Sequence, residues 1–184
     1  MSSHHIIRED QEPALLIDDA RSENSESIQQ LLEWSPTVIV TQRALEQILL
    51  SGTKIDVVIV PVLQIETLKN ELHDQFPLKI LSYNTESEAL DTALYYLNSS
   101  KQKALNVVSE AALESFEKFN ALDVSVIQSG KRWVFIKSGH FEKWLPAGAQ
   151  LLLYPEDAHP VPVVDNDGIV RVDRDHSFWI CEAD

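Results

Sequence analysis

The feature that most constrains the fold is an alternation of two hydrophobic periodicities along the first 120 residues. Short β-branched and aliphatic runs recur, and each is followed by a longer stretch with helical spacing. The expected strands are Ala14–Ile17, Thr37–Val40, Ile55–Val60, Leu78–Leu81 and Leu105–Val108. The expected helices are Ser25–Glu33, Arg43–Leu50, Gln64–Asp74, Glu86–Leu97 and Ala111–Phe119. Five such units predict an α/β domain over residues 1–120, with a mostly parallel, Rossmann-like sheet and helices on both faces.

The pattern changes near Asn120, where short strands and turns replace the helices. Two hairpins are expected, one around "SGKR" and one around "DNDG", the second joining Val161–Val164 to Ile169–Val172 with Gly168 at positive φ. The remaining short strands predict a small all-β sandwich or barrel over residues 121–184. Because so small a module is marginally stable alone, we expect it to pack on the first domain or form a homodimer.

Composition excludes several classes of partner. The net charge is −14, from 15 basic and 29 acidic residues, which argues against a nucleic-acid groove and an anionic membrane surface. No apolar run approaches the roughly 20 residues that span a bilayer. Cys181 is the only cysteine, so an intramolecular disulfide is excluded and a reducing, cytoplasmic location is expected. The six histidines and the acidic stretch "DNDGIVRVDRDH" lack the spacing of zinc or calcium ligands, so no metal site is predicted.

Several segments resemble thiamine pyrophosphokinases in layout. "VIVTQRALEQILLSGTKIDVVIV" is similar to a family region in which a strand leads to an Asp-Gly-Gly-Ala turn, and a later strand ends in Gly-Asp-Phe-Asp-Ser. "YNTESEALDTALYYL" resembles the family's Thr-Asp-x-x-x-Ala-Leu helix. "RWVFIKSGHFEKWLPAGAQLLLYP" and "FWICEAD" look like its β-rich thiamine-binding domain. The resemblance covers most of the chain and implies ATP, Mg²⁺ and thiamine as ligands if the family activity is retained.

The family's catalytic motifs are largely missing. Thr41-Gln42-Arg43 stands where the resemblance places Asp-Gly-Gly, and bulky side chains there would crowd a phosphate. Pro61-Val62-Leu63 replaces the segment that carries the family's magnesium-binding aspartates, and these side chains offer no hard oxygen ligand. The family's Gly-Arg-x-Asp-His segment has no counterpart after the fifth strand. We therefore predict no catalytic residue, and we expect Val62 and Leu63 to be buried in a filled cleft.

Two residues remain as candidates for ligand binding. Asp91 matches the Asp of the family's Thr-Asp pair, although an acidic residue near a helix start is also favoured by the helix dipole. Core packing is expected for the tryptophans of the β domain, Trp133, Trp144 and Trp179. Trp144, which precedes a Pro-Ala-Gly turn, is the first candidate for an exception, since in the resembled family an aromatic surface faces thiamine. Asp56 matches a family Pro-Asp position, and its expected role is hydrogen bonding where a strand begins.

Three functional hypotheses follow. The first, which we favour, is a non-catalytic thiamine pyrophosphokinase-like protein, a pseudoenzyme that acts by binding a thiamine-like small ligand. The second is an active thiamine pyrophosphokinase that transfers pyrophosphate from ATP with Mg²⁺ and takes its metal ligands from other positions. The third is an unrelated α/β protein with a β module for protein interaction. The first two differ in turnover, and the third differs from both in the topology of the β domain.

Overall fold

The computed structural model describes residues 12–21, 23, 25–33, 37–155 and 164–183. Its strands are β1 (Ala14–Ile17), β2 (Val38–Thr41), β3 (Val57–Pro61), β4 (Lys79–Tyr83), β5 (Ala104–Val108), β6 (Asp123–Gln128), β7 (Lys131–Ile136), β8 (His140–Leu145), β9 (Gln150–Tyr154), β10 (Gly168–Asp173) and β11 (Phe178–Ala183). The α-helices are α1 (Ser25–Leu32), α2 (Gln42–Leu50), α3 (Ile65–Glu71) and α4 (Ala89–Ser99). Short 3₁₀ turns are η2 (Val62–Gln64), η3 (His73–Gln75), η4 (Glu86–Glu88) and η5 (Leu113–Phe119).

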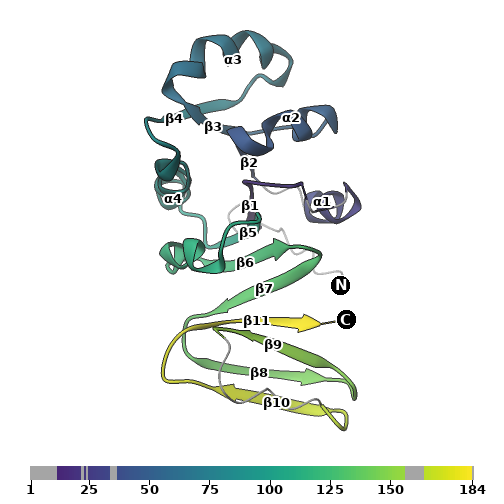
Figure 1. Ribbon diagram of the computed structural model, residues 1–184. Coiled ribbons are helices and arrows are strands. Elements are labelled where there is room, and N and C mark those ends of the chain that lie inside the picture. Colours follow the sequence, from purple (N-terminus) through teal and green to yellow (C-terminus); the bar gives the residue numbers. More distant parts are fainter. Residues whose placement is uncertain (1–11, 22, 24, 34–36, 156–163, 184) are drawn as a thin grey trace, which may run out of the picture.

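One large sheet runs through the molecule (Figure 1). Its nine described strands have the order β4-β3-β2-β1-β5-β6-β7-β11-β9. The pairs from β4 to β6 are parallel, and those from β6 to β9 are antiparallel. Strands β8 and β10 form a separate antiparallel pair. The predicted fold class is therefore confirmed: a mostly parallel α/β part is followed by a small antiparallel β part.

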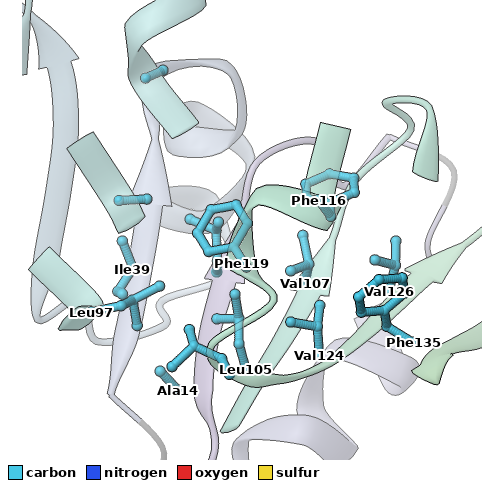
Figure 2. Close-up of a cluster of buried hydrophobic side chains, with 14 of the residues drawn as sticks. Ala14, Ile39, Leu97, Leu105, Val107, Phe116, Phe119, Val124, Val126 and Phe135 are labelled. Atoms are coloured by element: carbon cyan, nitrogen blue, oxygen red, sulfur yellow. The ribbon is translucent and has the colours of Figure 1, made fainter. Parts of the chain in front are cut away.

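Hydrophobic layers cover both faces of the parallel part because its strands are apolar on both sides. Helix α4 and η5 pack on one face, where Figure 2 shows Phe116 and Phe119 of η5 beside Val107 and Val124 of the sheet. Helices α1, α2 and α3 cover the other face, where Ile28, Ile48 and Leu68 are the most buried apolar side chains of their respective helices. The predicted placement of helices on both faces is confirmed.

A third core lies between the antiparallel end of the sheet and the β8–β10 pair. Its buried residues are Leu145, Leu151, Leu153, Val164, Val172, Phe178 and Ile180. On the opposite face of β11, Trp179 is fully buried against Phe135, with ring centroids 4.8 Å apart. Strand β11 therefore joins the two cores, since alternate residues of one strand face opposite sides.

The sheet continues across the predicted boundary at residue 120, because β6 pairs in parallel with β5. The division into residues 1–120 and 121–184 stays a prediction. The "SGKR" hairpin is confirmed, with Ser129 and Gly130 at positive φ between β6 and β7. The "DNDG" hairpin was wrong in detail: Gly168 does not have positive φ, and β10 pairs with β8. The proposed partner strand lies largely outside the described residues.

The fifth expected helix forms as the 3₁₀ helix η5 rather than an α-helix. Short 3₁₀ segments are common as connectors between regular elements. The apolar face of the segment forms as expected, because Leu113, Phe116 and Phe119 are all buried against the sheet.

Replacing Trp179 should destabilise the protein strongly, because the side chain is fully buried in the core that contains residues of both the parallel and the antiparallel strands. We expect Trp179→Ala to cost ~3–5 kcal/mol of unfolding free energy. The matched control is Trp144→Ala, since Trp144 is 58% exposed, and it should cost less than about 1 kcal/mol. Denaturant unfolding monitored by circular dichroism measures both values. Equal losses in the two variants would contradict the assigned core.

Candidate functional site

The candidate site lies at the carboxyl edge of the sheet, defined here as the edge at which the parallel strands end. From β1 the chain proceeds outward to β2, β3 and β4, and then crosses back to β5 on the other side of β1. The connections after β1 and β5 therefore leave in opposite directions, which opens a crevice between them in sheets of this class. Asp18 directly follows β1, and Ser109 directly follows β5.

The carboxylate of Asp18 is fully buried at this point and accepts hydrogen bonds from three elements. Thr41 Oγ1, at the end of β2, lies 3.1 Å from its Oδ1, and Ser109 Oγ lies 2.8 Å from its Oδ2. Arg43 of α2 places a terminal guanidinium nitrogen 2.9 Å from both oxygens. Thr41 Oγ1 also donates to the Asp18 carbonyl oxygen at 3.0 Å. Both oxygens of the buried carboxylate are thus engaged by groups of the chain itself.

The ion pair extends across the carboxyl edge through Arg43. Its Nε lies 3.5 Å from Glu86 of η4, and Glu86 accepts a hydrogen bond of 2.8 Å from the Tyr83 hydroxyl at the end of β4. Burial of the Tyr83 phenol, together with its hydrogen bond to Glu86, raises the pKa of Tyr83 to about 12. Tyr83 therefore stays a neutral donor at physiological pH. The network ties the ends of β1, β2, β4 and β5 into one unit.

The next residue, Asp19, is also buried and is bound by Arg21. The Arg21 guanidinium contacts both carboxylate oxygens, at 2.5 to 3.1 Å, and these hydrogen bonds are the main cause that lowers the pKa of Asp19. Glu23, also buried, accepts the Gly130 N–H at 2.9 Å. Arg43 contacts Asp18 and Glu86, and Arg21 contacts Asp19, whereas Glu23 accepts a backbone N–H. Four carboxylates thus stand against two guanidinium groups, so the edge carries a net negative field.

Sequence reasoning missed Asp18 and Asp19 because the end of the first expected strand was not considered as a site. The available signal was two consecutive carboxylates directly after an apolar run, at the end of a strand where sheets of this class bind ligands. Among the described residues, no group of three or more His, Cys, Asp or Glu side chains is placed to hold a metal ion. Arg43 and Arg21 are the cations that contact Asp18 and Asp19, respectively.

The expected burial of Val62 and Leu63 was wrong. Val62 is 44% exposed and Leu63 is 92% exposed. Strand β3 ends at Pro61, and the turn η2 carries both residues beyond the end of the strand before α3 begins at Ile65. Helix α3 returns to the core through Leu68, which lies one turn too late to cover them. The aspartate-lacking strand end is therefore an exposed apolar turn and not a filled cleft.

The two predicted ligand-binding residues lie on different elements. Asp91 is in the first turn of α4, and Lys118 of η5 donates to it at 2.7 Å. Trp144 lies on β8, opposite Ile169 of β10, and both are more than half exposed. Helix α4 and strand β8 are far apart in Figure 1, so one chain does not bring Asp91 and Trp144 together. Their role in binding stays a prediction. Trp179 has the expected core packing, and Trp144 is the exception.

The expected structural role of Asp56 is confirmed. Its carboxylate accepts the backbone N–H of Val38 at 2.8 Å, where β2 begins beside the start of β3. The chain contains no helix in its described part that is both long and apolar enough to cross a membrane.

The complete arrangement, with this strand order and the antiparallel extension, is the fold of thiamin pyrophosphokinases. The thiamin pyrophosphokinase of Geobacillus thermodenitrificans superimposes with a TM-score of 0.65 over 93% of this chain and 97% of that chain, at 8% identity. A probable thiamine pyrophosphokinase from Staphylococcus saprophyticus gives 0.60 over 93% and 98%, at 12% identity. The enzyme of Candida albicans gives 0.60 over 94% and 90%, at 8% identity. No protein-family model and no curated protein sequence matches the chain.

These superpositions establish a shared fold, and they cover the antiparallel part as well as the parallel part. The third hypothesis, an α/β protein with an unrelated β module, required a different topology at this end. The predicted resemblance is therefore confirmed at the level of the fold, with low identity that fits a divergent member.

Removing Arg43 should leave the buried Asp18 carboxylate without its cation. We expect Arg43→Met to cost about 3 kcal/mol, the lower end of the range for broken buried pairs, because Thr41 and Ser109 still donate. The double variant Asp18→Asn with Arg43→Met should recover part of this loss, since it removes the unpaired charge. Arg171→Met is the control, because Arg171 pairs with Glu142 at the surface and should cost about 1 kcal/mol or less. Equal costs for the two arginine variants, measured by equilibrium unfolding, would contradict the assignment.

The exposure of the η2 turn leads to a second prediction. Val62→Asp with Leu63→Asp should change the unfolding free energy by less than about 1 kcal/mol, because neither new carboxylate is buried. The matched control is Val60→Asp in the preceding strand β3, because Val60 is fully buried and this change should destabilise the protein severely. Thermal unfolding of the variants decides the point, and a large loss in the double variant would show that the turn is covered.

Proposed function

We propose that this chain is a non-catalytic protein of the thiamin pyrophosphokinase fold that acts by binding. The observation that carries the proposal is the buried Asp18 carboxylate, whose oxygens are taken by Thr41, Arg43 and Ser109 at the switch point of the sheet. A ligand phosphate placed there would meet a carboxylate, and Arg43 is already engaged with it. Such an arrangement opposes the approach of a polyanionic nucleotide.

The chemistry of pyrophosphoryl transfer supports the same proposal. Transfer from ATP depends on positioning and on neutralisation of phosphate charge by metal ions and cations. The resemblance places the magnesium-binding aspartates of the family where this chain has the exposed apolar turn at Val62 and Leu63. It places phosphate-approaching glycines where this chain has Gln42 and Arg43. ATP and Mg²⁺ therefore belong only to the alternative, an active thiamine pyrophosphokinase with ligands from other positions.

A thiamine-like molecule is the ligand class that we propose for this fold. Thiamine is a cationic aromatic molecule, which suits a chain of net charge −14. Trp144 offers an exposed aromatic face for stacking and cation–π contact, and Asp91 offers an exposed carboxylate. Because these two residues are far apart in one chain, we propose Trp144 as the contact and Asp91 as a contact only if a second chain brings it near. The single cysteine supports a reducing, cytoplasmic location.

The catalytic test uses purified protein with thiamine, ATP and Mg²⁺. We expect no thiamine pyrophosphate by chromatography, while thiamine alone should bind in a calorimetric titration that Trp144→Ala weakens. Turnover that is abolished by Asp91→Ala would overturn the proposal and favour the active enzyme. Asp123→Ala is the matched control for that variant, because Asp123 is also an exposed aspartate paired with a lysine, Lys137.

We also propose a two-fold homodimer, which stays a prediction. Trp179 is covered within the chain, and among the described residues of the β part Trp144 and Ile169, which face each other across β8 and β10, are the most exposed large apolar side chains. We expect light scattering at micromolar concentration to give a dimer mass and Ile169→Asp to shift it toward the monomer. A monomer mass for the unmodified protein would contradict this expectation.

A further inference from the structure

A polar break interrupts one row of side chains that crosses the large sheet. On the face covered by α1 and α2, the register aligns Val38, Leu15, Asn106, Ser125, Val134, Ile180 and Leu153 across strands β2, β1, β5, β6, β7, β11 and β9. All of these are apolar except Asn106 and Ser125. Asn106 is 8% exposed and lies in the middle of an otherwise apolar strand. A buried carboxamide at such a place needs hydrogen-bond partners.

The two polar groups of the Asn106 side chain, its carbonyl oxygen and its NH₂ group, differ in their hydrogen-bond partners. Its Oδ1 accepts from Ser125 Oγ at 2.6 Å and from the guanidinium of Arg132 at 3.1 Å. Because the carboxamide oxygen takes both donors, its NH₂ group faces the other way. Among the described residues, no acceptor for that NH₂ group lies within hydrogen-bond distance. A side chain more than nine-tenths buried thus presents two donors without a partner in the described chain.

Cavities adjoin these residues along the same face of the sheet. One, of about 560 Å³, is lined by Asn106, Arg132, Ile127 and residues of α1 that include Gln30 and Leu31. A second, of about 310 Å³, shares Asn106 and Arg132 with the first and extends over Ser125 and Val134. A third, of about 490 Å³, continues from Arg132 to Phe141 of β8. These volumes are in the range of small-molecule sites, and their walls combine apolar side chains with few polar groups.

Arg132 lines all three cavities, and none of the described carboxylates forms an ion pair with it. Arg21, Arg43 and Arg171 each contact a carboxylate, whereas among the described residues Arg132 makes no ion pair. The two carboxylates that line the cavities are already paired, Asp123 with Lys137 and Glu182 with Lys143. A guanidinium has five N–H donors, and the Asn106 oxygen uses one nitrogen of Arg132. A strongly acidic protein thus keeps an exposed guanidinium that has no ion pair among the described residues, beside an amide whose NH₂ group has no partner there.

We infer that the groove over β5, β6 and β7 is a binding site for a small molecule with one carboxylate and an apolar body. Arg132 would take the carboxylate through charge-assisted hydrogen bonds, and the Asn106 NH₂ group would donate to it. Ile127, Leu31 and Val134 would contact the apolar body. This site lies on a face of the sheet and not at its carboxyl edge, so it goes beyond the function proposed above and does not depend on it.

The test uses phenylacetate as the probe and phenylacetamide as its neutral isostere, with isotopically labelled protein observed by NMR. We expect phenylacetate to shift the side-chain resonances of Asn106 Nδ2 and Arg132 Nε saturably, with a dissociation constant on the order of millimolar for so small a ligand. Phenylacetamide should bind at least about tenfold more weakly, because it lacks the charge. Arg132→Gln should abolish the preference for the anion, and Arg132→Lys should retain part of it.

The matched control is Arg171→Gln, since Arg171 lies on β10 in an exposed ion pair and should leave phenylacetate binding unchanged. Unchanged Asn106 resonances at the highest phenylacetate concentration would overturn the inference. Equal binding of the neutral isostere, or an anion preference that persists in Arg132→Gln, would also overturn it. A shift that tracks protein concentration rather than ligand concentration would assign the groove to a contact between chains and exclude the small-molecule site.

Discussion

The structure depends on the position of β1, which is buried on both faces at the centre of the parallel part. All four residues of β1 are inaccessible to solvent, and the chain that follows delivers Asp18 directly into the space between the ends of β2 and β5. A carboxylate in that space requires partners, because burying an unpaired charge costs far more than any single contact returns. Thr41, Arg43 and Ser109 meet this requirement. The same residues thereby lie at the strand ends where sheets of this class normally bind a ligand.

The two faces of the sheet are completed in different ways. Beside α4 and η5, large aromatic and aliphatic side chains form one continuous core from Ala14 to Trp179. On the other face the helices cover only the parallel part, and the β8–β10 pair covers only the antiparallel end. Between them the floor of the sheet carries Asn106 and Ser125 rather than apolar residues. These buried polar side chains are tolerated there because Ser125 Oγ and Arg132 both donate hydrogen bonds to Asn106 Oδ1.

The carboxyl edge and the face of the sheet therefore differ in electrostatic character. At the edge, carboxylates outnumber the guanidinium groups that hold them, which is unfavourable for nucleotide phosphates. On the face, Arg132 forms no ion pair among the described residues, and the nearby carboxylates of Asp123 and Glu182 are bound by lysines. A chain with net charge −14 can thus repel anions at the usual ligand position of its fold and still attract a small anion elsewhere. Fold alone does not fix which of the two surfaces is used.

The sequence by itself determined that a mostly parallel sheet has helices on both faces, because hydrophobic periodicity is a local property of the chain. The order and spacing of its segments also determined the resemblance to thiamine pyrophosphokinases. The sequence also identified Trp144 as the candidate exception to core packing among the tryptophans of the β domain. Only the tertiary structure decided that Val62 and Leu63 are exposed, since their burial depends on where α3 turns back. Likewise, only strand order brings Asp18 beside Ser109, which is 91 residues away, and aligns Asn106 with Ser125 and Arg132. Such contacts depend on register and crossover geometry between distant segments, and no local pattern in the sequence specifies either.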